Sequence, residues 1–349
     1  MKKFIFIPLA VLFFCTNSLT AQKEYDVIRN NWIQFSDAPN ALYKHFAGQA
    51  YAFLQEREAA IEKITTLEEW QDRQKLIKKT LSDVVGAFPE RTPLNARVMR
   101  TVTKSDYKIE HIVYESVPGF LVTSSLFIPR QKTKKKLPAV IFCSGHAGIG
   151  YRTAGYQHPV LSLVKKGFIV FAFDPVGQGE RLQYQDTVAG KPVIKGPVPE
   201  HSYPGAQALI SGDSQARYMI WDGIRAVDYL LTRKEVDPDN IGITGRSGGG
   251  TQTAYIAAFD ERIKAAAPEC YLTNFTRLIQ NIGPQDAEQN FTAGIFHGLD
   301  EADLLLVRAP KPALMITTSR DIFNIEGAKE SEREVARIYQ AYGKSDSFG

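Results

Sequence analysis

From residue 139 onward, short apolar runs rich in β-branched and aromatic residues alternate with longer helical stretches, and this alternation limits the fold more than any other feature. The β-type runs are apolar along almost their whole length, as strands are when both faces of their sheet are covered. Strands of this kind, separated by helices, build a mostly parallel sheet between helical layers. We therefore predict an α/β fold. The predicted strands are residues 139–142, 168–173, 241–244, 263–267 and 313–317, and the predicted helices are 159–166, 213–232, 248–259 and 325–342.

Two strands ahead of this series are predicted to form an antiparallel hairpin. Apolar and polar residues alternate imperfectly through residues 107–114 and 120–128, and Pro118-Gly119 between them is typical of a turn. The hairpin makes the sheet mixed. We expect the α/β domain to occupy residues 106–349.

The stretch from residue 22 to residue 105 is expected to be a helical N-terminal extension. It lacks runs of β-branched residues, and residues 41–85 show helical spacing of apolar side chains. Within it, Thr66-Leu-Glu-Glu69 has the form of a capping box, in which the first side chain and the fourth satisfy each other's backbone N–H groups at the start of a helix.

Residues 1–21 have the pattern of a secretory signal peptide. Lys2 and Lys3 precede an apolar run over residues 4–15, which is too short to span a bilayer. We expect cleavage after Ala21 and a secreted or periplasmic protein. A lipid anchor on Cys15 is the alternative, but the bulky residue before it fits that signal poorly. No later run has the length and apolarity of a membrane span.

The charge and the cysteines exclude some classes of protein. The formal charge of +4 falls to about +2 without the signal peptide, too little to indicate nucleic-acid binding, and the basic residues 132–136 are expected in a solvated loop. Cys143 and Cys270 would then remain, at the ends of strands separated by two steps of about 4.8 Å. A disulfide needs Cα atoms within about 7 Å. We expect two buried thiols.

The strongest chemical motif is Gly245-Arg246-Ser247-Gly248-Gly249, which lies between a predicted strand and a predicted helix. In that setting a G-x-S-x-G sequence forms a tight turn that raises the serine hydroxyl above the sheet, next to the amino end of the helix. Ser247 is the predicted nucleophile. A glycine-rich nucleotide loop is the alternative, but these glycines lack the G-x-G-x-x-G spacing and no P-loop lysine follows.

An acyl-transfer site also needs hydrogen-bond donors for the oxyanion. One donor normally follows the nucleophile, and the other lies in the loop after an earlier strand. We assign the backbone N–H groups of Gly248 and of His146 or Ala147, the latter two in the glycine-containing loop 144–148. A plain tight turn is the alternative reading of that loop.

The predicted acid is Asp321, which follows the late strand 313–317, as the acid does in this fold. Asp321 could instead cap a turn or a helix, and Glu269, just after strand 263–267, is a rival acid. Arg246 beside the nucleophile could meet a carboxylate of a substrate or simply be solvated.

The base that should take the serine proton is a histidine, and none follows Asp321 in this sequence. His297 precedes it, inside the long connection 271–310; it could contact substrate, and as a base it would need an unusual chain order. This connection and another over residues 178–211 are expected to be lids. Residues 345–349 resemble the approach to a last strand, so we expect the sequence to be truncated before the histidine loop.

Four sequence blocks resemble the acetylxylan-esterase-like and dienelactone-hydrolase-like carbohydrate esterases of bacteria. These blocks are Cys143-Ser-Gly-His-Ala-Gly148, Phe173-Asp-Pro-Val-Gly-Gln-Gly-Glu-Arg181, Gly245-Arg-Ser-Gly-Gly-Gly250 and Ile325-Glu-Gly327. The resemblance implies an α/β-hydrolase fold, an acylated carbohydrate as substrate, and Ser247 and Asp321 as nucleophile and acid. It leaves the family's histidine without a position here.

The first functional hypothesis is therefore a secreted serine esterase that removes acyl groups, chiefly acetyl, from polysaccharide or oligosaccharide. It requires no cofactor and no metal, and no His/Asp cluster with the spacing of metal ligands stands out in the sequence. A glucuronoyl methyl esterase or a serine peptidase of the same fold is the second hypothesis. A catalytically inactive carbohydrate-binding or scaffold domain is the third.

Overall fold

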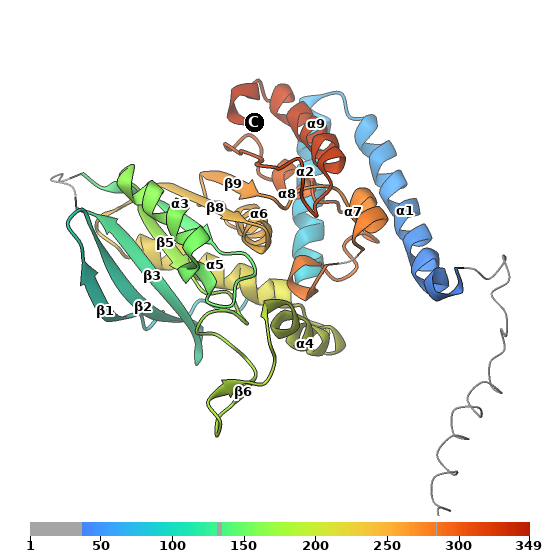
Figure 1. The fold of residues 1–349 in the computed structure, drawn as a ribbon. Coiled ribbons are helices and arrows are strands. Elements are labelled where there is room, and N and C mark those ends of the chain that lie inside the picture. Colours follow the sequence, from blue (N-terminus) through green and yellow to red (C-terminus); the bar gives the residue numbers. More distant parts are fainter. Residues whose placement is uncertain (1–36, 131–134, 284) are drawn as a thin grey trace, which may run out of the picture. The chain divides into compact units, whose positions relative to one another are not determined.

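The computed structural model describes residues 37–130, 135–283 and 285–349 (Figure 1). The predicted signal peptide, its cleavage site and most of the predicted basic loop lie outside these residues. The chain divides into two units, Met1–Gln49 and Ala50–Gly349. The described part of the first unit contains the short helix η3 (Ala38–Asn40) and the beginning of α1 (Ala41–Glu62).

Within the described residues, seven strands form one mixed sheet in the order β1-β2-β3-β5-β4-β8-β9. The predicted hairpin is confirmed as β2 (Tyr107–Val117) and β3 (Phe120–Pro129), which pair antiparallel. An edge strand, β1 (Arg97–Thr103), pairs antiparallel with β2. It lies within residues 22–105, which were expected to form a helical extension, and that expectation is wrong for this strand. All but one of its residues are exposed, so it lacks the apolar alternation by which strands are recognised.

The other half of the sheet is parallel, as predicted. Its strands are β4 (Leu137–Cys143), β5 (Ile169–Phe173), β8 (Val236–Arg246) and β9 (Ala265–Glu269). The register places Cys143 beside both Phe173 and Gly245, and Arg246 beside Glu269. The carboxyl ends of these strands therefore meet at one edge, where open α/β sheets bind ligands.

The predicted strand 313–317 makes parallel contacts with β9 without forming a continuous strand. Leu314 N–H donates to Ala266 O at 2.9 Å, and Cys270 N–H donates to Ile316 O at 2.8 Å. On the other side of this segment, Met315 N–H donates to Gly349 O at 2.7 Å. The segment thus continues the parallel ladder beyond β9.

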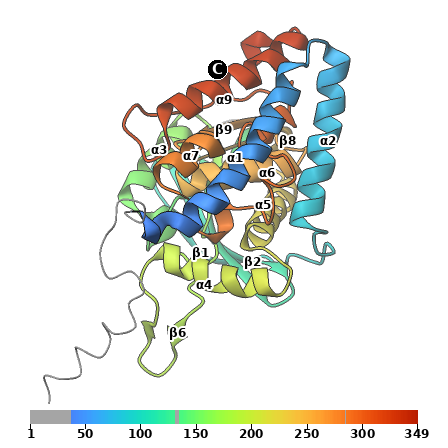
Figure 2. The same cartoon turned by 90° about the vertical axis from the view of Figure 1, so that its right-hand side faces the viewer.

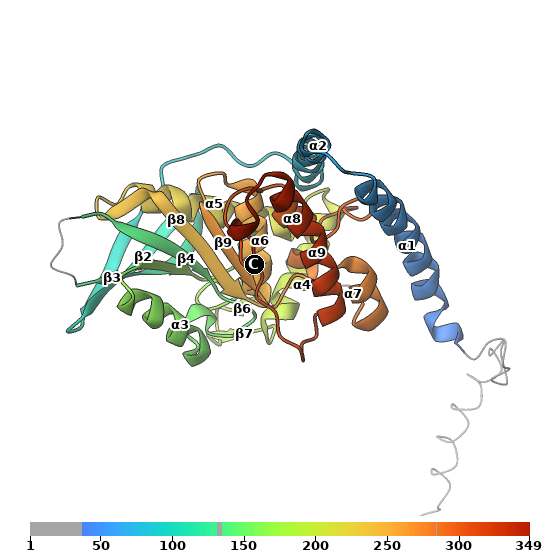
Figure 3. The same cartoon turned by 90° about the horizontal axis from the view of Figure 1, so that it is seen from above.

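The two faces of the sheet are covered by different helices (Figure 3). Phe142, Val170 and Ala172 pack with side chains of α3 (Ala154–Lys165). The alternate residues Ile141 and Phe171 pack with side chains of α5 (Gln215–Leu231) and α6 (Gly248–Phe259). Because successive side chains in a strand point to opposite faces, this division confirms that both faces are buried.

The helices before the sheet also contribute to the core. The capping box predicted at Thr66 and Glu69 is present, and it begins α2 (Leu67–Val85). Trp70 and Ile77 of α2 belong to a buried cluster that includes side chains of α5, α6 and α9 (Ile325–Ala341) (Figures 1 and 2). Among the described residues, no helix combines the length and apolarity needed to cross a membrane.

Both long connections contain short elements of their own. The first carries a two-stranded hairpin and α4, and the hairpin extends away from α4 in Figures 1 and 2. The second carries α7, η5 and α8. Their bounds are β6 (Gln185–Asp186), β7 (Lys191–Pro192), α4 (Pro197–Ile210), α7 (Phe275–Asn281), η5 (Ala287–Gln289) and α8 (Asp303–Leu306), and the remaining short helices are η4 (Gly150–Arg152) and η6 (Ser345–Ser347).

The two cysteines lie where the sequence predicted them. Cys143 ends β4 and Cys270 follows β9, with β8 between the two strands. Both are buried and free of disulfide bonds in the described part of the chain.

Candidate active site

Ser247 lies in the turn between β8 and α6, with φ of +58° and ψ of −126°. A positive φ is uncommon outside glycine and is typical of the strained turn that holds a nucleophilic serine. The Ser247 N–H donates to Glu269 O at 2.9 Å, which ties the turn to the end of β9. Ser247 is partly exposed, and its Oγ makes no hydrogen bond to a described residue.

The turn is packed too closely for side chains at its glycines. A Cβ at Gly245 would lie 2.2 Å from Cys143 O, and one at Gly249 would lie 2.1 Å from the same atom. Such distances are far below van der Waals contact. The glycines of the motif therefore allow β8 and α6 to approach the end of β4.

The predicted oxyanion loop, residues 144–148, lies against Ser247. A Cβ at Gly145 would be 3.2 Å from Ser247 Cβ. Gln178 Nε2 donates to Gly145 O at 2.8 Å, and Gln252 Nε2 donates to Ser144 O at 3.2 Å. These glutamines fix the carbonyl groups and hence the orientation of the loop.

The two assigned oxyanion donors flank this contact. Gly248 is the first residue of α6, so its N–H has no acceptor within the helix. His146 follows Gly145, and its ring lies against Gly248: a Cβ on Gly248 would be 2.8 Å from His146 Cε1. The two backbone amides remain predicted donors, on neighbouring segments.

Tyr156 of α3 is a neighbour of the site that the sequence did not indicate. Its hydroxyl would lie 2.6 Å from a Cβ on Gly145 and is hydrogen-bonded to the Gly145 backbone. Burial raises the pKa of Tyr156, so its phenol stays neutral. A tyrosine in the first turn of a helix carries no sequence signal that separates it from a packing residue.

Asp321 lies near the end of the segment that extends the parallel ladder. Its Oδ2 accepts from Thr318 Oγ1 at 2.9 Å and its Oδ1 accepts from Phe323 N–H at 3.3 Å. It also neighbours Cys270, whose pKa is raised by burial and by the charges of Asp321 and Glu269. Asp321 therefore lies close to the end of β9, to which Ser247 is bonded, and its role as acid remains a prediction.

The remaining candidates from the sequence are Arg246, Glu269 and His297, and none of them is bonded to the side chain of Ser247 in the described structure. Arg246 is exposed, and its Nε lies 3.6 Å from Glu269 Oε1, so the rival acid faces the arginine. His297 is exposed and stacks edge-on with Phe296, which in turn packs against Phe53 of α1. Among the described residues, His297 makes no hydrogen bond to Ser247.

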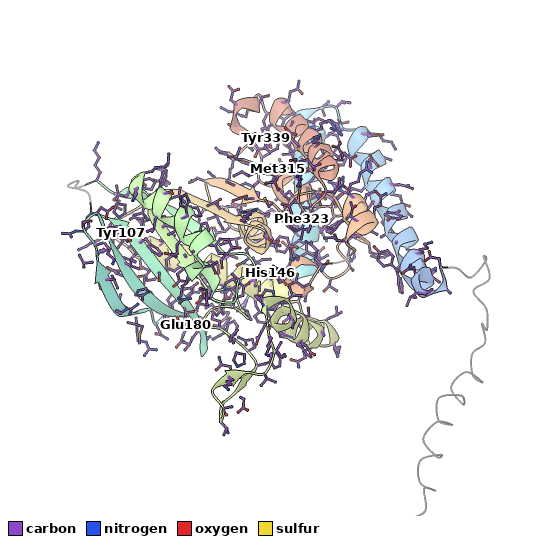
Figure 4. All side chains as sticks on the ribbon, in the orientation of Figure 1. Tyr107, His146, Glu180, Met315, Phe323 and Tyr339 are labelled. Carbon is purple, nitrogen blue, oxygen red and sulfur yellow. The ribbon has the colours of Figure 1, made fainter. Side chains whose placement is uncertain are left out.

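The side chain of His146, labelled in Figure 4, belongs to a largely buried cluster of ionisable groups. Its Nε2 lies 2.9 Å from Asp286 Oδ2 and 2.9 Å from Glu288 Oε1. The ring of His201, from α4, joins the same two carboxylates. The sequence predicted a role only for the backbone amide of His146. The expectation that the chain has no His/Asp cluster is wrong, because the fold joins residues as far apart as 146 and 288.

The carboxylates dominate the protonation of this cluster. Burial alone would lower the pKa of His146, but the hydrogen bonds and charges of Asp286 and Glu288 outweigh it and raise the pKa to about 10. The same balance raises the pKa of His201 to about 9. Burial opposes ionisation of Asp286, yet its bonds to the two rings keep its pKa below the ordinary range. Without another cation, both rings would be positively charged at neutral pH.

Comparison with known proteins points to one family. The model of the family described as Acetyl xylan esterase (AXE1) matches residues 80–293. The "Putative hydrolase YtaP" of Bacillus subtilis (strain 168) is 24% identical over 289 residues, which cover 78% of this chain and 89% of that protein.

Solved structures share the fold. A "putative acetyl xylan esterase" from Bacteroides fragilis NCTC 9343 superposes with a TM-score of 0.65 at 18% identity, covering 81% of this chain and 75% of that one. A glucuronoyl esterase from Solibacter usitatus superposes with a TM-score of 0.58 at 16% identity, covering 80% of this chain and 83% of that one. At these identities the likeness confirms the predicted α/β-hydrolase architecture.

Proposed function

Because the chain belongs to the acetyl xylan esterase (AXE1) family, whose members are carboxylic ester hydrolases, we propose that it removes acyl groups, chiefly acetyl, from polysaccharide or oligosaccharide. The observation that carries the proposal is the strained turn at Ser247, placed at the carboxyl edge of the parallel part of the sheet, with a hydroxyl that makes no hydrogen bond to a described residue. An acylated carbohydrate is the substrate class that the family implies.

The proposed reaction is an acyl transfer in two steps. Ser247 Oγ forms a bond to the acyl carbon and gives its proton to a general base, which passes it to the departing sugar oxygen. The amides of Gly248 and of His146 or Ala147 donate to the oxyanion. Water then attacks the acyl-enzyme, releases the acid and restores the Ser247 hydroxyl. Asp321 would orient the base.

In the proposed reaction the general base is a histidine, as it is in other serine hydrolases of this fold. None of the six histidines of residues 1–349 is hydrogen-bonded to Ser247 Oγ or to Asp321 in the described structure. In this fold the histidine follows the acid in the chain.

A second candidate substrate is a glucuronoyl methyl ester, which one observation favours. Arg246 is next to the nucleophile, its side chain is 57% exposed, and its separation of 3.6 Å from Glu269 is too long for a strong hydrogen bond. An exposed guanidinium at this position could bind the sugar carboxyl group of a uronate. Methanol, rather than acetate, would then be released.

The place where the protein acts is also part of the proposal. We infer that residues 1–21 direct export and that the mature protein is secreted or periplasmic. Polymeric plant-type carbohydrate lies outside the cell, so a family of polysaccharide esterases favours this location. Amino-terminal sequencing of the protein exported by its native host would test cleavage after Ala21.

The test is product release by the full-length gene product from acetylated xylan, a glucuronoyl methyl ester and a peptide panel. Acetate release that is lost in Ser247→Ala and kept in the exposed-loop control Ser105→Ala would support the acetyl esterase. Methanol or peptide release would select the other hydrolases. Equal background rates for the wild type and Ser247→Ala would contradict the proposal and favour an inactive binding or scaffold domain.

A further inference from the structure

Four side chains from three separate segments point at one small volume beside the nucleophile turn. They are His146 from the loop after β4, His201 from α4, and Asp286 and Glu288 from the region of η5. One ligand-type atom from each lies within 4.8 Å of all the others. His146, labelled in Figure 4, marks the position of the cluster between the end of β4 and α4.

The ring of His201 is held in the orientation of a metal ligand. Its Nε2 lies 2.9 Å from Val176 O, and a carbonyl oxygen can only accept, so Nε2 carries the hydrogen. In the neutral ring, Nδ1 then has a lone pair, and this atom faces Asp286 Oδ2 at 3.2 Å and Glu288 Oε2 at 3.1 Å. A backbone carbonyl that fixes the remote nitrogen in this way is typical of metal-binding histidines.

Glu288 supplies a second sign of a missing partner. Its side chain is 2% exposed, and Oε2 has no hydrogen bond in the described structure although it lies close to His201 Nδ1. Buried carboxylate oxygens are normally bonded, because burying one without a partner costs free energy. The unpartnered oxygen points at the volume that the other three side chains enclose.

We propose that His146, His201, Asp286 and Glu288 bind one divalent transition-metal ion, for which Zn²⁺ is the probe. Two carboxylates and two neutral rings carry a charge of −2, which a dication neutralises. Ligands about 2.0–2.2 Å from a tetrahedral centre lie about 3.3–3.6 Å apart. The contacts of 2.9–3.2 Å and the upper limit of 4.8 Å bracket that separation, so small side-chain movements suffice.

The ligand set also selects the class of ion. Two imidazole nitrogens suit zinc and similar transition metals, whereas Ca²⁺ and Mg²⁺ prefer sites made only of oxygen. The ion would join the loop after β4 to α4 and η5, and His146 would then be held against Gly248. The site is therefore a structural one that supports the nucleophile turn, and the inference does not depend on the proposed esterase activity.

The test is Zn²⁺ binding to the chelator-treated full-length protein, followed by calorimetry and by the thermal midpoint. We expect one ion per chain and a higher midpoint with Zn²⁺, but no response to Ca²⁺. His201→Gln and Asp286→Asn keep the size of the side chains, and each should weaken Zn²⁺ binding at least about tenfold. The matched control His158→Gln, at an exposed position on α3, should bind as the wild type does.

Several outcomes would overturn the proposal. These are the absence of saturable binding in the wild type, binding of equal strength in His201→Gln and Asp286→Asn, or an equal loss in His158→Gln. If the two cluster variants fail to fold, the visible spectrum of the Co²⁺-loaded wild type decides: a four-coordinate spectrum with nitrogen ligands supports the site, and a six-coordinate or absent spectrum rejects it. If the metal site is rejected, the cluster is an ion-pair network of charged rings and carboxylates.

Discussion

Replacing Gly249 by alanine should damage the nucleophile turn in a measurable way. The new Cβ would lie 2.1 Å from Cys143 O, 2.8 Å from Cys143 C and 2.9 Å from Ser144 C. All three are backbone atoms at the end of β4, and ordinary contact begins at 3.4 Å, so the backbone must move by more than 1 Å. Overpacking of this kind costs about 3 kcal/mol, and the better helix propensity of alanine returns about 1 kcal/mol. We expect a net loss of about 2 kcal/mol.

Urea unfolding and esterase assays would measure both consequences. With a slope of about 2–3 kcal/mol per molar, the midpoint should fall by about 1 M. The displaced loop carries the predicted oxyanion donor His146 and touches Ser247, and a misplacement of about 1 Å can reduce activity about 100-fold. We expect Gly249→Ala to show both losses.

Gly155 provides a matched control because it is also the second residue of its helix, α3. A Cβ there meets nothing within 4 Å. Gly155→Ala should leave activity unchanged and raise stability by up to about 1 kcal/mol. If Gly249→Ala has the same urea midpoint and the same esterase activity as the wild type, the predicted clash between α6 and the end of β4 is wrong.

Two further predictions concern the buried charges between the helices. Arg57 forms ion pairs with Asp303 at 2.9 Å and with Glu334. Because Arg57→Met would leave the buried carboxylate of Asp303 short of positive charge, it should lower the free energy of unfolding by about 3 kcal/mol. Urea unfolding would measure this loss. Burial raises the pKa of Asp300 to about 6. The folded protein therefore holds the proton of Asp300 more tightly than the unfolded chain does. The stability gained in this way is lost as the pH rises from about 4 to about 6. Asp300→Asn removes this pH dependence, so its free energy of unfolding should rise by about 3 kcal/mol relative to that of the wild type between pH 4 and pH 7. If the difference in unfolding free energy between the two proteins is constant across that range, the pKa of Asp300 is not raised.

The parallel part of the fold could be predicted from the sequence because strands that are buried on both faces have apolar side chains along most of their length. β4 and β5 appear as nearly continuous apolar runs, and α6 begins and ends where the pattern predicted. β8 begins five residues before the predicted strand 241–244, and this extension was missed because residues 237–240 are polar or exposed and carry no strand pattern. β1 could not be found in this way, since its side chains face solvent and its pairing with β2 is made by the backbone.

The candidate site likewise contains some features that local sequence predicts and others that depend on packing between distant segments. Ser247 could be placed from local sequence because the turn needs small residues between a strand and a helix. The bonds of Gln178 and Gln252 to the loop, and the hydroxyl of Tyr156 beside it, depend on packing between distant segments. The cluster of His146, His201 and Glu288 was missed for the same reason, since no local spacing connects residues that α4 and η5 bring together.

Covalent labelling would show whether Ser247 is the nucleophile of a carbohydrate esterase. The full-length protein would be treated with a fluorophosphonate, and the modified residue located by peptide mass spectrometry while acetate release from acetylated xylan is followed. We expect one label, on Ser247, whose appearance matches the loss of acetate release. A label on another residue, or full acetate release by Ser247→Ala, would contradict it.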